Sequence, residues 1–365
     1  MTGASTIVRH PRPGPRGALR PRVAAVLLGI AVLLPTVAAP AAGAAPAFTG
    51  NAESGTKCAS GSGPAATPIV LTLREANGVN VETVATTVDG NGYWSACFPA
   101  LGLITVGRKI RVEGGGKART VAVPALTSFG DRVKDRISGA APAGGSVSVR
   151  LFRCLILIRC TQKLQRTAQR KPSGAWFVRH AVAFDARGLD RSYVTWRSPK
   201  NDRFMLRGFY PGFMALVGTQ AVNGLYRPGR TVTISLRAAL GDPPTASVSV
   251  ATGAYPSFTS TLPSGTILGG YYVEADFALD ASLRIPTIER SWAAGTKQIG
   301  GKCLPNLPVL LDWPENPGDP IGGTADADGW YRTALRPSTP GPANVGVVSV
   351  SCQSVRGDVA VLAGG

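Results

Sequence analysis

Short runs of alternating apolar and polar residues recur along most of the chain, and they predict β-strands with one buried face. The clearest apolar positions are Ile69, Leu71 and Leu73, then Val147, Val149 and Leu151, then Val232, Ile234 and Leu236, and finally Val348, Val350 and Cys352. Turn signals rich in Gly, Asp, Asn and Pro separate these runs, and no long amphipathic helix is predicted after residue 47. The sequence therefore predicts an all-β fold.

A glycine followed by aromatic residues returns four times at nearly constant spacing. The copies are Gly92-Tyr93-Trp94, Gly174-Ala175-Trp176, Gly253-Ala254-Tyr255 and Gly329-Trp330-Tyr331, at intervals of 82, 79 and 76 residues. Other landmarks recur two periods apart, such as 123–126 and 285–288. A period of this length is typical of a small all-β domain repeated in tandem. We predict four antiparallel, immunoglobulin-like β-sandwich modules of about seven strands each, spanning residues 48–128, 129–208, 209–289 and 290–365.

The first 47 residues have the pattern of a secretory signal peptide. Five arginines precede the apolar run from Val23 to Leu34, and a Pro-Ala stretch ends at Ala47, where cleavage is predicted. An uncleaved membrane anchor is the alternative, but the run is short for a span and Pro35 follows it directly. We expect an exported chain, extracellular or associated with the cell envelope, with no transmembrane segment after cleavage.

Export makes the six cysteines candidates for disulfide bonds. They fall in three of the predicted modules, as Cys58 with Cys97, Cys154 with Cys160, and Cys303 with Cys352. Pairing within modules is the most economical of about fifteen connectivities. On one strand the middle pair would be about 20 Å apart, so it can bond only across a hairpin. A zinc site is the alternative, but the exported chain has a single histidine and no close Cys-x-x-Cys pair, so we expect no metal.

Positive charge is concentrated in the second predicted module. The whole sequence has a formal net charge of +18, and residues 129–208 contain 17 Lys and Arg against five Asp, a net charge of +12. The predicted first hairpin of this module carries Arg150, Arg153, Arg159, Lys163, Arg166, Arg170 and Lys171. Such a surface attracts polyanions, which indicates an anionic cell-wall polymer or polysaccharide as partner, or another envelope protein. The alternative is a solvated basic face that reflects an arginine-rich composition.

Nucleic acid is the less expected polyanion. Binding of single strands requires stacking aromatic side chains on the basic face, and the candidates in this module are Phe152, Tyr193 and Trp196. Trp196, Trp292 and Trp313 lie outside the repeated motif. They suggest an alternative function, a carbohydrate-binding protein with exposed tryptophans, although packing between modules is the commoner use of such residues.

The sequence has no pattern that indicates catalysis, so we predict a protein that is not an enzyme and has no cofactor. Its exported part has one histidine, His180, which we expect at the surface end of a strand, and no Gly-x-Ser-x-Gly elbow. Its seven glutamates are scattered rather than clustered. An enzyme or enzyme accessory with a site between modules is the remaining alternative.

Two short motifs have simple explanations. Residues 326–329 (Asp-Ala-Asp-Gly), matched by 89–92 (Asp-Gly-Asn-Gly), begin like a calcium loop but lack its distant glutamate, so we expect tight turns. Arg356-Gly357-Asp358 matches an adhesion tripeptide, but three residues recur often by chance.

The turn rich in Asp, Asn and Gly that leads into a Gly-aromatic strand resembles tandem immunoglobulin-like and transthyretin-like (carboxypeptidase-regulatory-like) modules of bacterial secreted and surface proteins. The resemblance rests on residues 89–94 and 326–331, and more loosely on 173–176 and 253–255. It implies a sandwich fold and a role as a spacer, adhesion or binding module, without catalytic residues. The expected function is thus that of a secreted, non-enzymatic interaction or spacer protein.

Overall fold

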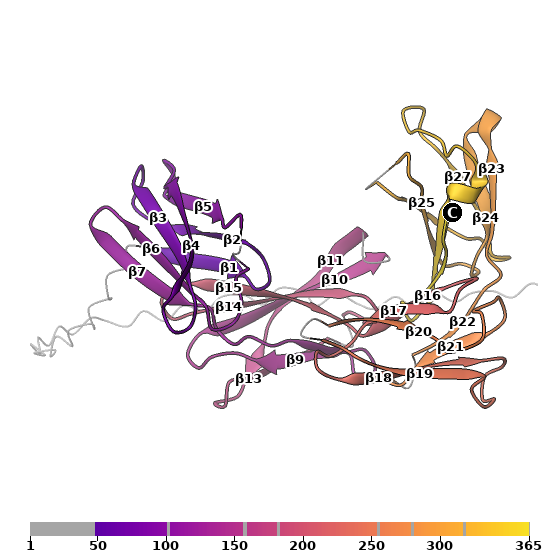
Figure 1. Ribbon diagram of the computed structural model, residues 1–365, viewed down its shortest axis with the longest axis horizontal. Coiled ribbons are helices and arrows are strands. Elements are labelled where there is room, and N and C mark those ends of the chain that lie inside the picture. The colour runs from indigo at the N-terminus through magenta and orange to yellow at the C-terminus, as the bar shows by residue number, and fades with distance from the viewer. Residues whose placement is uncertain are drawn as a thin grey trace, which may run out of the picture. The chain divides into compact units, whose positions relative to one another are not determined.

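A computed structural model describes residues 48–100, 103–155, 159–180, 183–253, 256–278, 281–316 and 319–364. Within these ranges the protein is all-β, with 29 strands, two short 3₁₀ helices and no α-helix (Figure 1). The predicted signal peptide, residues 1–47, lies outside the described residues. In the part that is described, no helix is long and apolar enough to cross a membrane.

The strands of residues 48–210 are β1 (Thr49–Glu53), β2 (Cys58–Ser62), β3 (Pro68–Arg74), β4 (Asn80–Thr87), β5 (Tyr93–Cys97), β6 (Lys109–Gly114), β7 (Lys117–Ala122), β8 (Phe129–Asp131), β9 (Arg136–Ala140), β10 (Ser146–Leu155), β11 (Arg159–Thr167), β12 (Gln169–Arg170), β13 (Ala175–Arg179), β14 (Arg191–Arg197) and β15 (Arg203–Phe209). They form a seven-stranded sheet of order β11-β10-β14-β15-β1-β2-β5 and two four-stranded sheets, β4-β3-β6-β7 and β12-β13-β9-β8.

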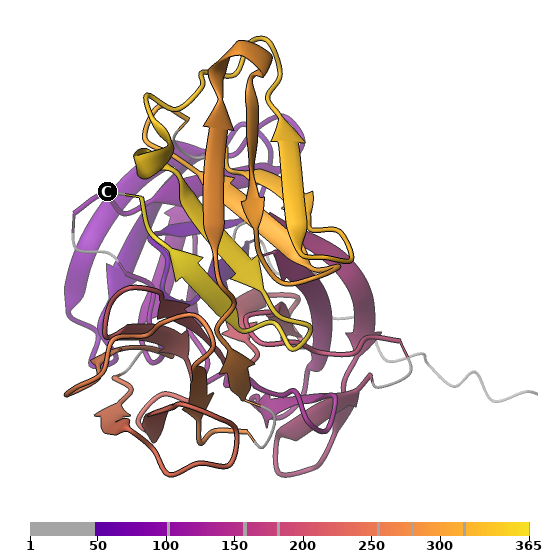
Figure 2. The ribbon, with the colours of Figure 1, turned by 90° about the vertical axis from the view of Figure 1, so that its right-hand side faces the viewer.

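Residues 211–364 repeat this plan with β16 (Gly212–Leu216), β17 (Ala221–Leu225), β18 (Thr231–Arg237), β19 (Ala246–Ala251), β20 (Ser257–Thr261), β21 (Tyr272–Ala275), β22 (Ser282–Arg284), β23 (Glu289–Ala293), η1 (Ala294–Thr296), β24 (Gln298–Lys302), β25 (Pro308–Asp312), β26 (Ile321–Thr324), β27 (Trp330–Ala334), η2 (Val345–Val347), β28 (Ser349–Gln353) and β29 (Val359–Leu362). The sheets are β20-β17-β16-β29-β28-β25-β26, β19-β18-β21-β22 and β23-β24-β27. Figure 2 shows the yellow C-terminal hairpin of β28 and β29, which pair antiparallel.

Each seven-stranded sheet contains one parallel junction between antiparallel parts. β1 pairs with β15, with Asn51 beside Arg203 and Glu53 beside Met205. β16 pairs with β29 in the same way. These junctions were not predicted: strands of the first and second predicted modules belong to one sheet, as do strands of the third and fourth.

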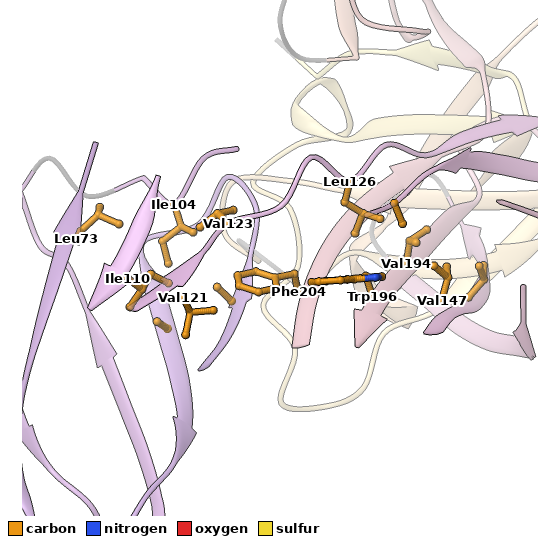
Figure 3. Close-up of a cluster of buried hydrophobic side chains, with 14 of the residues drawn as sticks. Leu73, Ile104, Ile110, Val121, Val123, Leu126, Val147, Val194, Trp196 and Phe204 are labelled. Carbon is orange, nitrogen blue, oxygen red and sulfur yellow. The ribbon is translucent and has the colours of Figure 1, made fainter. Parts of the chain in front are cut away.

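The hydrophobic core is also continuous across the predicted boundary at residue 128. One buried cluster extends from Phe48 to Tyr210, and another from Phe213 to Ala360. In the first cluster the rings of Trp196 and Phe204 stack with centroids 6.2 Å apart. Figure 3 shows this pair between Val121 on one side and Val194 on the other, where it joins the two parts of the core.

The repeated Gly-aromatic motif has a packing explanation. In four places a core aromatic residue lies directly across from a glycine of the neighbouring strand: Gly61–Trp94, Gly139–Trp176, Gly224–Phe258 and Gly301–Tyr331. A Cβ atom at any of these glycines would lie within 2.7 Å of the aromatic side chain. In the third copy the aromatic is Phe258, not the predicted Tyr255, which lies outside the described residues.

The glycines of the motif itself are required by backbone conformation. Gly92, Gly174 and Gly329 have φ angles of 78°, 85° and 85°, a left-handed region that favours glycine. Each immediately precedes its aromatic strand, so the turn and the core aromatic are specified together in three of the four copies.

Three disulfides form, each within one predicted module: Cys58–Cys97, Cys154–Cys160 and Cys303–Cys352. The first two join directly opposed residues of neighbouring strands, and the second closes the predicted β10–β11 hairpin. The third links Cys303, the residue after β24, to β28, and these two strands belong to different sheets. The prediction of three disulfides is confirmed.

Candidate functional site

Two of the predicted polyanion contacts, Arg153 and Arg170, bind other residues of the protein itself. The Arg153 Nε donates to Asp190 Oδ2 at 3.1 Å, and its guanidinium lies 5.0 Å from the Phe184 ring centroid. Arg170 donates to the carbonyl oxygens of Pro142 and Gly145. These two arginines are therefore engaged in structural contacts and are poorly placed to hold a ligand.

The other predicted basic residues of the hairpin are more accessible. Arg159 forms an exposed ion pair with Asp319 at 3.2 Å. Lys163, Arg166 and Lys171 are exposed, and in the described ranges none of their side chains has a hydrogen bond or ion pair. Lys163 and Arg166 lie on the edge strand β11 and provide a diffuse positive charge there, whereas Lys171 follows β12 of a four-stranded sheet.

Arg150 belongs instead to an ordered array on the outer face of the first seven-stranded sheet. Valines and leucines at alternate positions of β10 point to the core, so Arg150 and Phe152 point outward. Strand register places Arg150, Tyr193 and Arg207 in one row across β10, β14 and β15. The next row of the same strands contains Phe152, Arg191 and Phe209.

Cations and rings alternate in this array, which we call the arginine–aromatic face (Arg150, Phe152, Arg191, Tyr193, Arg207 and Phe209). The guanidinium carbons of Arg150 and Arg207 lie 5.6 and 5.5 Å from the Tyr193 ring centroid. The Arg191 guanidinium lies 5.9 Å from the Phe209 centroid, and Phe152 meets Tyr193 edge to face at 5.2 Å. Contacts of this kind stabilise an exposed pair by about 0.5–1 kcal/mol and fix the guanidinium groups in place.

The electrostatics of the face favour an added anion. Partial burial lowers the pKa of the Arg191 guanidinium, Tyr193 opposes this shift, and the positive charge of Arg207 adds to it. Arg207 also forms an ion pair of 3.1 Å with Glu53, an acidic residue at the end of β1. Among the described residues, the face holds three arginines and one carboxylate, that of Glu53, so its formal charge is positive.

A groove of about 780 Å³ adjoins this face on the same sheet, crossing β10, β14, β15, β1 and β2. Its polar lining includes Asn51, Glu53, Arg150, Gln165, Arg197 and Arg203. We call it the sheet groove. Volumes of about 300–1,000 Å³ are typical of ligand sites, so the groove is large enough for a small organic ligand or part of a chain.

Sequence reasoning missed five residues of this surface, namely Arg191, Arg197, Arg203, Arg207 and Phe209. The signal was present in the alternation of β14, where Ser192, Val194 and Trp196 are buried between outward-facing residues. Local crowding of charge pointed to the β10–β11 hairpin, whereas the ordered site also needs β15. Trp196 is buried and takes no part, while Phe152 and Tyr193 lie on the face as candidate stacking residues.

The expectation that His180 is a surface residue is wrong. His180 is 3% exposed, with Nδ1 2.6 Å from the Phe184 carbonyl oxygen and Nε2 2.5 Å from the Tyr210 hydroxyl. Burial lowers the pKa of its imidazole. Both ring nitrogens are engaged in the core, so His180 is a structural residue.

The Arg356-Gly357-Asp358 tripeptide is not an accessible adhesion motif. The Asp358 side chain is 0% exposed and forms two hydrogen bonds of 3.0 Å with Arg132, which is itself buried. Asp358 Oδ1 also accepts the Phe213 amide at 3.1 Å. The aspartate connects the C-terminal hairpin to β8 and β16 in the interior.

The carbohydrate-binding alternative requires exposed tryptophans, and this expectation is wrong for two of the three residues. Trp196 and Trp313 are buried, and the Trp313 indole N–H donates to the Pro340 carbonyl at 3.2 Å. Trp292 is half-buried against the second core. Separate residues in the core cannot present one flat surface to a sugar.

The two calcium-like motifs form tight turns. Asp89 Oδ1 accepts the amides of Asn91 and Tyr93 at 2.9 and 2.8 Å. Asp326 Oδ1 accepts those of Asp328 and Trp330 at 3.0 and 2.8 Å. Among the residues that the structure describes, no group of three or more His, Cys, Asp or Glu could hold a metal ion.

No known protein family matches the chain, and no curated protein is significantly similar to it. Similar solved structures include a tetra-tandem repeat from the extending region of a large adhesion protein (16% identity, 86% of this chain and 97% of that one, TM-score 0.16). A Ca²⁺-stabilized adhesin that helps an Antarctic bacterium reach out and bind ice is 14% identical over 88% of this chain and 99% of that one, with a TM-score of 0.16.

A third solved structure is the BSP domain of a biofilm-associated protein, 8% identical over 86% of this chain and 94% of that one, with a TM-score of 0.17. Identities and TM-scores this low assign neither a family nor a function. The all-β fold class rests on the chain's own sheets.

Proposed function

We propose that this chain is an exported, non-enzymatic interaction or spacer protein of four β-sandwich modules, whose second module contacts an anionic polymer of the cell envelope or the extracellular space. The observation that carries the proposal is the arginine–aromatic face, an outward-facing array in which Tyr193 and Phe209 hold three arginines in fixed positions. The three disulfides support export, because such bonds persist in oxidising compartments.

Charge and geometry favour a polymer over a small anion. The arginines of the face lie on β10, β14 and β15, and the neighbouring edge strand β11 carries the exposed Lys163 and Arg166, so a long anion can contact the face and then the sheet edge. Binding of this kind depends strongly on salt, because it releases counterions from the polymer and because mobile ions screen exposed charges.

The test measures retention of the protein, residues 48–365, on immobilised anionic polymers across a sodium chloride series. The test variant R150Q/R191Q/R207Q removes three charges from the face. The control R284Q/R332Q/R336Q removes the same number from exposed arginines of the third and fourth predicted modules. We expect wild type and control to be retained at low salt and released as salt rises, with the test variant released much earlier.

Two results would count against the proposal. One is a wild-type protein that passes through every anionic resin even at low salt. The other is equal weakening by the test and control variants, which would mean that total charge and not the array determines retention.

A further inference from the structure

Two arginines lie directly opposite each other in the sheet groove. Arg197 of β14 and Arg203 of β15 are register partners, and Asn51 of β1 is the next residue in the same row. Like charges placed opposite each other on neighbouring strands repel. An anionic group bound between the two guanidinium groups would relieve that repulsion.

The groove itself offers little to neutralise these arginines. Glu53 is the single carboxylate among the groove residues that the structure describes, and it is paired with Arg207 at 3.1 Å. The Arg197 Nε donates to the Asn201 side-chain oxygen at 2.5 Å, a neutral partner. The Arg203 side chain is exposed and has no hydrogen bond or ion pair in the described part of the chain. A ligand carboxylate can therefore bind here without displacing an internal ion pair.

The rest of the lining is rich in neutral hydrogen-bonding groups. It includes Ser60, Ser146, Ser148, Thr195, Asn51 and Gln165. None of these side chains makes a hydrogen bond to another described residue. Hydroxyl and amide groups both donate and accept, which suits a ligand that carries many hydroxyl groups.

The spacing of charge within the groove indicates how the anionic groups of the ligand are distributed. Arg150 also lines the groove, four residues along the strand from the row of Arg197 and Arg203, because its register partner is Tyr193. At about 3.3 Å per residue, the two positive positions are about 13 Å apart. The ligand therefore needs anionic groups that recur at about this distance on one side of its chain. Binding of single-stranded nucleic acid also requires aromatic rings for stacking, and the rings of the adjoining face do not line the groove.

We propose that the sheet groove binds an acidic polysaccharide, with one carboxylate between Arg197 and Arg203, a second at Arg150, and sugar hydroxyls on the Ser, Thr, Asn and Gln side chains between them. This inference rests on the proposed function, since it names the polymer class and the residues that select it. The groove is open, so a chain can continue from it onto the arginine–aromatic face.

Titration calorimetry with polygalacturonate oligomers tests the inference, with their carboxyl-reduced, neutral counterparts as the ligand control. The groove variant is R197Q/R203Q, and the matched control is R332Q/R336Q. We expect the groove variant to bind about tenfold to a hundredfold more weakly, since removing one charge-assisted hydrogen bond weakens binding by about tenfold. The control should change affinity less than twofold, a difference below about 0.5 kcal/mol. The neutral oligomer should not bind.

A second variant, R203K, separates charge from fold, because it keeps the positive charge on a surface side chain. It should retain more affinity than R203Q. Equal weakening in R203K and R203Q, with unchanged circular dichroism, would show that charge at this position does not select the ligand.

The outcome separates this inference from the proposed function. If the wild-type protein binds polygalacturonate no better than polyphosphate or single-stranded DNA, and R197Q/R203Q binds it as tightly as wild type, the groove does not select a polysaccharide, although anionic-polymer binding stands. If no polyanion binds at low salt, both fail.

Discussion

Replacing Asp358 by asparagine should reduce the free energy of unfolding by about 3–5 kcal/mol, because it breaks the buried ion pair with Arg132. The two side chains are 0% and 1% exposed, so solvent cannot compensate for the missing carboxylate. The substitution keeps an oxygen that can accept the Phe213 amide, a bond of 3.1 Å in the native protein. The change therefore tests mainly the missing charge.

The assay is equilibrium denaturation by guanidinium chloride, followed by tryptophan fluorescence, with the transition midpoints compared at equal slope. Asp319→Asn is the matched control, because Asp319 pairs with Arg159 at the surface, where the side chains are 81% and 50% exposed. Such a pair contributes about 0–1 kcal/mol. The double variant R132M/D358L should recover most of the stability, since apolar replacements of a buried pair are often neutral.

The reasoning is refuted if Asp358→Asn shifts the midpoint no more than Asp319→Asn does. It is also refuted if R132M/D358L is less stable than Asp358→Asn, because the cost would then come from altered packing and not from the broken ion pair.

Two further predictions concern the core and the pH dependence of stability. Gly139→Ala should destabilise the protein by about 1–3 kcal/mol or more, because its Cβ would lie 2.7 Å from the Trp176 ring and 1.8 Å from a backbone oxygen. Gly90→Ala is the control and should have little effect, since there is open space around Gly90. Equal denaturation midpoints for the two variants would contradict this prediction. Burial raises the pKa of Asp190 to about 6 from 3.8, so the unfolded chain loses this proton first and stability should fall by about 3 kcal/mol as pH rises from about 4 to 6. Asp190→Asn should remove that slope from denaturation midpoints measured across this range, and an unchanged slope would rule out Asp190 as its source.

The strands could be predicted from the sequence because their burial pattern is local. The alternation of Val147, Val149 and Leu151 directly marks the inward side of β10. The parallel junctions could not be predicted, because β1 and β15 lie about 150 residues apart in the sequence and each has the pattern of an ordinary strand. An alternating pattern states which side is buried but not which distant strand lies alongside.

The candidate site could be predicted only in part, for the same reason. Charge density drew attention to the second predicted module, but whether an arginine is available depends on residues far along the chain. Arg153 is engaged by Asp190, and Arg150 becomes part of an array through Tyr193 and Arg207. His180 was misplaced because its partner Tyr210 lies 30 residues away, after two further strands.

The parallel junctions determine how the chain responds to mechanical tension. β1 and β15 run in the same direction, so pulling Phe48 and Tyr210 apart loads their ladder in shear, where its hydrogen bonds resist together. The residues between Glu53 and Arg203 carry no force until that ladder breaks. β16 and β29 repeat the arrangement between Pro211 and Ala363. Force along the polypeptide thus passes through two short ladders in series. The residues enclosed by each ladder can unfold and extend only after that ladder breaks.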